Sequence, residues 1–145
     1  MAMSKPIRII IADNDQEFSK HLKNFLDQQE DLQVIDLIRD GHGTVSACRD
    51  SLPDLVVIDL HLPVLDSVRT IQSILVQNEH VKILTISALP NDRYAVEAIK
   101  VGAHGFVEKN GANSLAEIES AIRQVALGEV VLNSALASRI LHEFS

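Results

Sequence analysis

The stretch that decides the fold is PDLVVIDLHLP at residues 53–63. Leu55 to Ile58 are all apolar, and such a run predicts a strand that is buried on both faces, as in a parallel sheet. Asp59 follows at the carboxyl end of this strand, and Pro63 marks a loop beyond it. A carboxylate in this place serves either as a helix cap or as a functional group, so the other strand ends matter.

Similar apolar runs recur along the chain and predict four more strands, at residues 7–12, 32–38, 81–86 and 105–107. Between them, apolar residues repeat at helical spacing and predict helices over residues 16–29, 44–51, 68–75, 94–101 and 115–125. Strand and helix alternate five times. This alternation predicts an α/β fold with a doubly wound parallel sheet and helices on both faces.

Composition limits the classes of protein that the chain can represent. With 145 residues, it has room for one domain and a short extra segment. Aromatic residues make up 3%, so the core must be built from aliphatic side chains. The lone Cys48 forms no internal disulfide and is interpreted as core filler. The net charge of −7 argues against direct binding of nucleic acid.

Targeting signals are not evident in the sequence. No apolar stretch approaches the roughly 20 residues of a membrane span, and the N-terminus carries no apolar run of signal-peptide length. We therefore expect a cytoplasmic location and no membrane partner.

Polar side chains follow four of the five predicted strands. The first strand ends at Asp13-Asn14-Asp15, the third at Asp59, the fourth at Ser87, and the fifth leads to Lys109. Each group alone is an ordinary cap, turn or solvated residue. Because parallel strands place their carboxyl ends at one edge of the sheet, the four groups together predict a single pocket.

The chemistry of this set is that of phosphoryl transfer. Carboxylate oxygens suit Mg²⁺, and a carboxylate can attack phosphorus to form an aspartyl phosphate. We predict Asp59 as the nucleophile and Asp13 and Asn14 as metal ligands. The hydroxyl of Ser87 and the ammonium of Lys109 are then placed to hold the phosphoryl oxygens.

These residues resemble the receiver domain of two-component response regulators over residues 6–128. The matching segments are IADN at 11–14, PDLVVIDLHLP at 53–63, TISA at 85–88 and GAHGFVEK at 102–109. The resemblance implies a flavodoxin-like sheet of strand order 2-1-3-4-5. It also implies that the chain is not an enzyme beyond its own phosphorylation and dephosphorylation.

The resemblance also implies roles for individual residues. Asp59 is the phosphorylation site, Mg²⁺ binds near Asp13, Asp59 and the backbone carbonyl of His61, and Lys109 contacts the phosphoryl group. The donor is the histidine of a sensor histidine kinase or of a phosphotransfer protein.

A switch pair is implied as well. On phosphorylation the hydroxyl of Ser87 is drawn toward the phosphate, and the ring of Phe106 turns inward. The expected output surface comprises residues 91–101, 105–107 and 113–127. A phosphorylation-linked homodimer through this surface is a hypothesis.

The sequence departs from the receiver pattern at the metal site and in the next loop. Asn14 replaces the usual second acid of the first pair and brings no charge, so we predict weakened Mg²⁺ affinity. Asp15 either compensates from the next position or caps the following helix. Val64 and Ser67 stand where glycines are common, which predicts a stiffer loop.

Residues 129–145 stand apart from the receiver domain, which we assign to residues 1–128. Asn133 or Ser134 is placed to cap one further helix. Either this helix docks on the domain, or it is a linker toward a further domain. Residues 126–141 resemble the linker of the NarL/LuxR-type subfamily, which implies transcription control. DNA would be bound only through a helix-turn-helix effector domain absent from this chain.

Two other functions are open at this point. A phosphorylation-independent receiver would act as a protein-interaction module, which the weakened acidic pair favours. A haloacid-dehalogenase-type phosphatase would use Asp13 as nucleophile and Asp15 as acid/base. That reading leaves Asp59 without a role, and no Asp follows Lys109 to supply later metal ligands.

Overall fold

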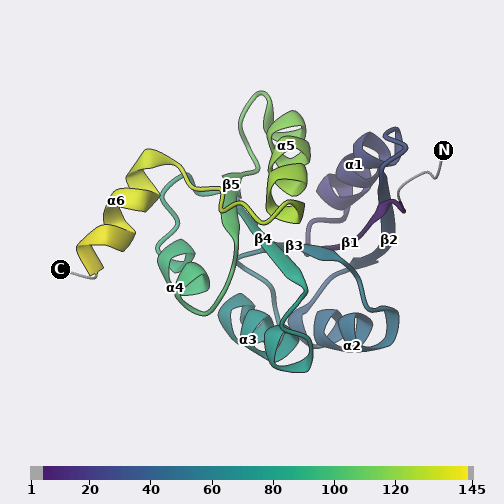
Figure 1. The fold of residues 1–145 in the computed structure, drawn as a ribbon, viewed down its shortest axis with the longest axis horizontal. Coiled ribbons are helices and arrows are strands. Elements are labelled where there is room, and N and C mark those ends of the chain that lie inside the picture. Colours follow the sequence, from purple (N-terminus) through teal and green to yellow (C-terminus); the bar gives the residue numbers. More distant parts are fainter. Residues whose placement is uncertain (1–4, 144–145) are drawn as a thin grey trace.

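A computed structural model describes residues 5–143 as a parallel sheet flanked by helices (Figure 1). The strand order is β2-β1-β3-β4-β5, as the resemblance implied. The strands are β1 (Ile7–Ala12), β2 (Leu32–Ile38), β3 (Leu55–Asp59), β4 (Lys82–Ser87) and β5 (Gly105–Glu108). The order reverses direction between β1 and β3, and the carboxyl ends of these two strands therefore border the crevice where ligands of such sheets bind.

Helices cover both faces of the sheet, as predicted. One face carries α1 (Gln16–Asp27) and α5 (Ser114–Ala126), and the other carries α2 (Gly41–Ser51), α3 (Ser67–Gln77) and α4 (Tyr94–Lys100) (Figure 1). All five residues of β3 are buried, because this central strand is covered by helices on both sides. Cys48 lies on the buried side of α2, in the core, and burial raises the pKa of its thiol to about 12. Its predicted role as core filler is confirmed.

The second helix begins at Gly41 rather than at the predicted Thr44. Asp40 sets this start, because its Oδ1 accepts a hydrogen bond of 2.7 Å from the N–H of Gly43. Gly41 itself lies against the loop that follows β3, where an added Cβ would be 2.2 Å from the carbonyl oxygen of Leu65. Only glycine therefore allows this close approach of α2 to the loop.

The predicted C-terminal helix is present as α6 (Ser134–Glu143), and it docks on the domain. Asn133 caps it, with its Oδ1 accepting from the N–H of Leu136 at 2.8 Å. The side chain of Leu136 is buried in the same hydrophobic cluster as residues of α4. The chain before α6 runs beside β5, where Val131 O accepts from the N–H of Phe106 at 2.9 Å. Residues 144 and 145 of the predicted segment lie outside the described residues.

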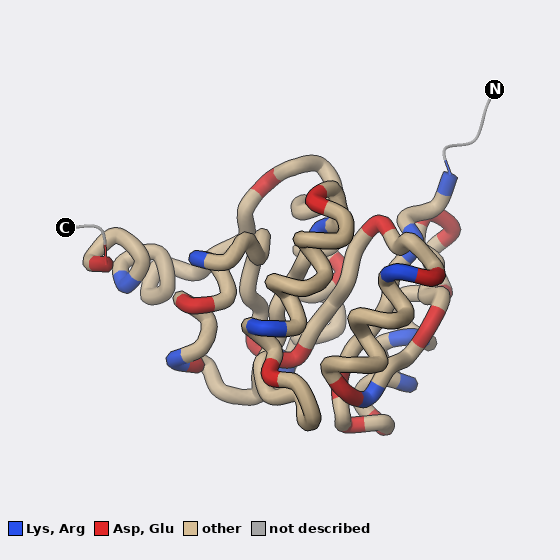
Figure 2. The backbone as a smooth tube through the Cα atoms, turned by 90° about the horizontal axis from the view of Figure 1, so that it is seen from below, with Lys and Arg blue, Asp and Glu red and all other residues tan. Residues whose placement is uncertain are grey.

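Charged residues are spread over the elements. In Figure 2, acidic and basic positions are interspersed, and the Lys and Arg residues do not gather on one element. Among residues 5–143, the helices are too short or too polar to cross a membrane.

The loop after β3 contains a strained residue. Val64 has a φ of +74°, in the left-handed region, although its side chain is 76% exposed. A β-branched residue is costly there, because its Cβ crowds the following carbonyl. The predicted stiffness of this loop stays a prediction.

Replacing Val64 by glycine should raise the free energy of unfolding by about 1 kcal/mol, because the left-handed strain disappears and little buried surface is lost. Urea unfolding monitored by circular dichroism measures the change. Val76→Gly is the matched control, since Val76 is 87% exposed but lies inside α3. There glycine should lower stability by a few tenths of a kcal/mol. Equal effects of the two substitutions would contradict the assignment of strain to Val64.

Candidate functional site

Three of the sequence-predicted site residues meet at the carboxyl edge of the sheet. Asp13 follows β1, Asp59 ends β3, and Lys109 follows β5. The Lys109 ammonium lies 2.7 Å from Asp13 Oδ2 and 2.8 Å from Asp59 Oδ2. All three side chains are at most 10% exposed. The parallel sheet has thus brought together two acids and one base that are distant in the sequence.

Backbone groups fix the orientation of both carboxylates. Asp13 Oδ1 accepts from the N–H of Asp15 at 2.9 Å, and Asp59 Oδ1 accepts from the N–H of His61 at 2.6 Å. The second oxygen of each carboxylate is left to face Lys109. Each acid therefore presents one oxygen to the same point in space, which is where a cation or a phosphoryl group would be bound.

The three charges perturb one another. Burial raises the pKa of Asp13, and the charge of Asp59 adds to this, while the hydrogen bonds from Lys109 and from the N–H of Asp15 oppose it. Burial lowers the pKa of Lys109, but its hydrogen bonds to Asp13 and Asp59 outweigh burial, so its pKa lies above the ordinary value. The pocket holds two acids and one base, so it retains an affinity for a further cation.

The donor set fits a magnesium ion that keeps several of its waters. Asp13 and Asp59 offer hard carboxylate oxygens at one point, which is the chemistry Mg²⁺ prefers. Asn14 is exposed beside them. Asp15 caps α1 instead, since its Oδ1 accepts from the N–H of Phe18 at 3.1 Å. Among the described residues, no three His, Cys, Asp or Glu side chains converge on one position.

Ser87 does not join this group of charges. Its hydroxyl donates to Asp92 Oδ2 at 2.6 Å and accepts from the N–H of Leu89 at 3.0 Å. The same Asp92 oxygen lies 2.5 Å from Nε2 of His61. Both hydrogen bonds of the Ser87 hydroxyl are therefore made to the loop before α4.

Phe106 is already turned inward. Its side chain is 4% exposed and belongs to the cluster that also contains Leu136 of α6. The two residues of the implied switch pair therefore differ. The ring of Phe106 is buried, as implied for the phosphorylated form, whereas the hydroxyl of Ser87 is bonded to Asp92 and not directed at Asp59.

Several residues around the site were not found from the sequence. Phe18 of α1 lies beneath Lys109, whose ammonium is 4.9 Å from the centre of the ring. Ser67 ties the loop after β3 to the strand, since its hydroxyl donates to the carbonyl of Asp59 at 2.5 Å. Asp92 is 2% exposed and carries three side-chain hydrogen bonds. An acid two residues before a helix reads as a cap, so the sequence held no signal of its further contacts.

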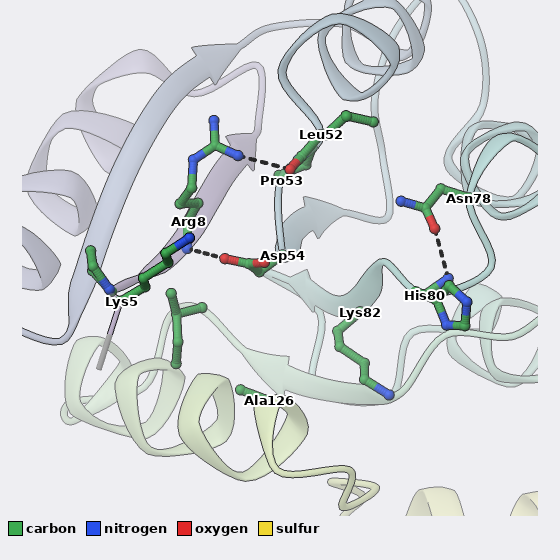
Figure 3. Close-up of a pocket in the computed structure, with 11 residues that line it drawn as sticks. Lys5, Arg8, Leu52, Pro53, Asp54, Asn78, His80, Lys82 and Ala126 are labelled. Atoms are coloured by element: carbon green, nitrogen blue, oxygen red, sulfur yellow. Dashed lines mark hydrogen bonds between the residues drawn. The ribbon is translucent and has the colours of Figure 1, made fainter. Parts of the chain in front are cut away.

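A hollow of about 620 Å³ lies at the opposite edge of the sheet, where β1, β3 and β4 begin (Figure 3). Arg8 dominates it, donating from Nη1 to the carbonyl of Leu52 at 2.8 Å and from its backbone N–H to Asp54 Oδ2 at 2.8 Å. Asn78 accepts from the N–H of His80 at 3.0 Å. These bonds fasten the connections into the strands, and none of the sequence-predicted site residues lines this hollow.

The fold and the edge pocket are those of a signalling receiver. Residues 9–123 match the family model described as the response regulator receiver domain. The chain belongs to this family, and the predicted family is confirmed. This assignment replaces the alternative of a haloacid-dehalogenase-type phosphatase. In that alternative Asp15 was the acid/base, whereas here its side chain caps α1.

Two proteins of known name are similar to this chain over most of its length. It is 32% identical over 138 residues to a protein-glutamate methylesterase/protein-glutamine glutaminase of Caldanaerobacter subterraneus, covering 94% of this chain and 36% of that protein. It is 25% identical over 137 residues to the transcriptional regulatory protein YxjL of Bacillus subtilis, covering 94% of this chain and 62% of that protein. The chain therefore spans less than two thirds of either relative.

Solved structures agree on the fold. A LuxR-family response regulator from Aurantimonas superposes with a TM-score of 0.85 at 23% identity, covering 97% of this chain and 99% of that chain. The receiver domain of a response regulator NarL from Mycobacterium tuberculosis gives 0.78 at 23% identity, covering 87% and 100%.

The raised pKa of Asp13 predicts a pH-dependent stability. In the folded protein Asp13 binds its proton more tightly than in the unfolded chain, so stability falls as the pH rises from the ordinary carboxyl value through the raised pKa. Asp13→Asn removes this cost. In buffer with EDTA, it should raise the free energy of unfolding by about 1 kcal/mol at pH 7.5 and by much less at pH 4.

Urea unfolding at the two pH values measures this difference. Asp50→Asn is the control, because Asp50 is exposed on α2 and should change stability by less than about 0.5 kcal/mol at both values. A loss of stability in Asp13→Asn at pH 7.5 would mean that the pairing with Lys109 outweighs the cost of burying the charge.

Proposed function

We propose that this chain accepts a phosphoryl group on Asp59 and signals through the resulting change. The observation that carries the proposal is the triad of Asp13, Asp59 and Lys109, in which one ammonium holds two buried carboxylates at the switch point of the sheet. Membership of the receiver family supports the same assignment.

In the proposed step, Asp59 Oδ2 attacks the phosphorus of the donor, forming an O–P bond as the bond to the leaving group breaks. The leaving group departs with the bonding electrons and takes up a proton, so no other reactant is needed. Lys109, now between the two carboxylates, would hold a phosphoryl oxygen. Receiver domains bind Mg²⁺, and when bound here it would neutralise charge on the transferring group.

The metal would be held by Asp13, Asp59, the Asn14 amide and the backbone carbonyl of His61, with water completing the shell. Asn14 supplies no charge to this set. We therefore propose that Mg²⁺ binds, but more weakly than it would to a site with a second acid at position 14.

The donor that we propose is the phosphohistidine of a sensor histidine kinase or of a phosphotransfer protein. We further propose that residues 1–128 form the receiver and that residues 129–145 lead to a DNA-binding effector domain. YxjL, of which the chain spans 62%, bears the name of a transcriptional regulator, which supports this. A homodimer through the face of α4, β5 and α5 stays a prediction.

A second candidate is a receiver that acts through protein contacts without phosphate. The observation in its favour is the metal site, where Asn14 adds no charge and Lys109 already occupies the inward oxygen of both acids. This candidate predicts that the wild-type chain gains no mass in the acetyl phosphate experiment that follows.

Incubation with acetyl phosphate and Mg²⁺ should add one phosphoryl group to the wild-type chain, detected by intact mass spectrometry. Asp59→Asn should show no gain, because the amide that replaces the nucleophile keeps its shape but not its reactivity. Ser134→Ala, distant from the pocket in α6, is the control and should gain the same mass as wild type. A wild type that gains no mass would favour the phosphate-independent module.

Asn14→Asp should tighten Mg²⁺ binding roughly tenfold, because a second carboxylate adds charge to the donor set. Isothermal titration with MgCl₂ at low ionic strength measures both dissociation constants. Asn110→Asp tests for long-range charge alone, since Asn110 lies just after Lys109 and is exposed. Equal affinities of wild type and Asn14→Asp would overturn the proposed role of Asn14.

A further inference from the structure

We propose that Asp92 is a latch that holds Ser87 in its unswitched position and couples the phosphorylation pocket to helix α6. The proposal rests on the function proposed above, because it concerns how that site is regulated. It adds Asp92 and Arg139 to the residues of the switch, as positioning residues that do not touch the phosphoryl group.

The buried carboxylate of Asp92 is the centre of the latch. Its Oδ2 accepts from the hydroxyl of Ser87 at 2.6 Å, and its Oδ1 accepts from the backbone N–H of Tyr94 at 2.9 Å. Burial opposes the charge of Asp92, but these hydrogen bonds outweigh it, and the pKa of the carboxyl lies below its ordinary value. A buried carboxylate is a strong acceptor, so it competes with a phosphoryl oxygen for the single proton of Ser87.

His61 joins the latch from the other side of the pocket. Its Nε2 lies 2.5 Å from Asp92 Oδ2 and donates to it, because a carboxylate oxygen can only accept. The backbone N–H of His61 meanwhile donates to Asp59 Oδ1 at 2.6 Å. The ring of His61 also packs edge-on against Tyr94, with centroids 5.6 Å apart. The residue that orients the nucleophile is therefore the same residue that secures Asp92.

The backbone of Asp92 reaches the C-terminal helix. Its carbonyl accepts from Arg139 Nη1 of α6 at 3.3 Å, while Ala95 also donates to it at 3.1 Å from the first turn of α4. A second tie between the two helices joins Lys100 to Glu143 at 3.4 Å. A movement of the loop at Asp92 would therefore disturb the contacts that hold α6 on the domain.

In this proposal the loop at Asp92 has two states, of which the structure shows the first. In the first state, Ser87 is bonded to Asp92 and Arg139 is bonded to the carbonyl of Asp92. In the second, Ser87 turns to the phosphoryl group on Asp59, the carboxylate of Asp92 loses that donor, and the loop shifts away from Arg139. Because the two events share one equilibrium, a change that loosens α6 must also favour the phosphorylated-like state.

Two variants test the coupling from its two ends. Asp92→Asn keeps Oδ1 as acceptor for Tyr94, and so keeps the start of α4, but it removes the charged acceptor of Ser87. Arg139→Gln removes the contact with the loop and lies on α6, away from the pocket. Arg123→Gln is the matched control, because Arg123 of α5 pairs with Asp31, just before β2, and with Glu119 of α5, and it has no bond to the loop at Asp92.

The first readout is hydrogen exchange of residues 134–143 in the unphosphorylated chain, followed by mass spectrometry. Local opening sets this rate, and the loss of one hydrogen bond should raise it about threefold in Asp92→Asn and in Arg139→Gln. The second readout is the affinity for the phosphoryl mimic beryllofluoride with Mg²⁺. Arg139→Gln should bind it about threefold more tightly than wild type, by reciprocity. Arg123→Gln should change neither quantity.

Unchanged exchange in Asp92→Asn, or unchanged beryllofluoride affinity in Arg139→Gln, would overturn the coupling. Failure of the proposed function is a separate result, in which the wild type gains no mass with acetyl phosphate. The exchange measurement needs no phosphate, so it still tests the latch in that case. A melting temperature of Asp92→Asn close to that of wild type, with exchange raised only in 134–143, separates a latch from a general loss of structure.

Discussion

Two buried carboxylates held by one ammonium are the interaction on which the rest of this structure depends. Asp13, Asp59 and Lys109 stand at three strand ends, their side chains are at most 10% exposed, and the ammonium of Lys109 pairs with both carboxylates. The parallel sheet makes their meeting possible, because it directs the carboxyl ends of β1, β3 and β5 to one edge. The surplus negative charge that results is of the sign that suits the pocket to a metal cation.

The loops around this pocket are tied to it rather than free. Ser67 fastens the loop after β3 to the carbonyl of Asp59, and Gly41 lets α2 approach the same loop closely. Val64 holds a left-handed conformation between these two anchors. Strain of this kind persists only where surrounding contacts over-determine the backbone, and it is common beside functional sites.

Asp92 restrains the hydroxyl of Ser87 through a hydrogen bond of 2.6 Å. A hydroxyl has one proton to donate, so Ser87 cannot serve Asp92 and a phosphoryl group at once. The ring of Phe106 is already buried with Leu136 of α6 beside it in the same cluster.

The sequence by itself determined the alternation of strands and helices, the strand carrying Asp59, and the pocket formed with Asp13 and Lys109. These follow from local periodicity and from the rule that parallel strand ends share an edge, so they need no coordinates. The sequence also pointed to a cap at Asn133 or Ser134, and the structure shows that Asn133 is the cap. The start of α2 was missed, because an Asp before Gly-rich residues reads as a turn.

Only the tertiary structure decided the partners of Ser87 and the place of the last helix. Ser87 ends β4, Asp92 lies in the loop that follows it, and His61 lies in the loop after β3. Their side chains meet only through tertiary packing, and hydrogen bonds of this kind leave no periodic signal in a sequence. Whether Asp15 faced the metal or the helix depended on the entry angle of α1. Whether α6 docked or projected depended on an apolar surface of α4 and β5 that exists only once the sheet has formed.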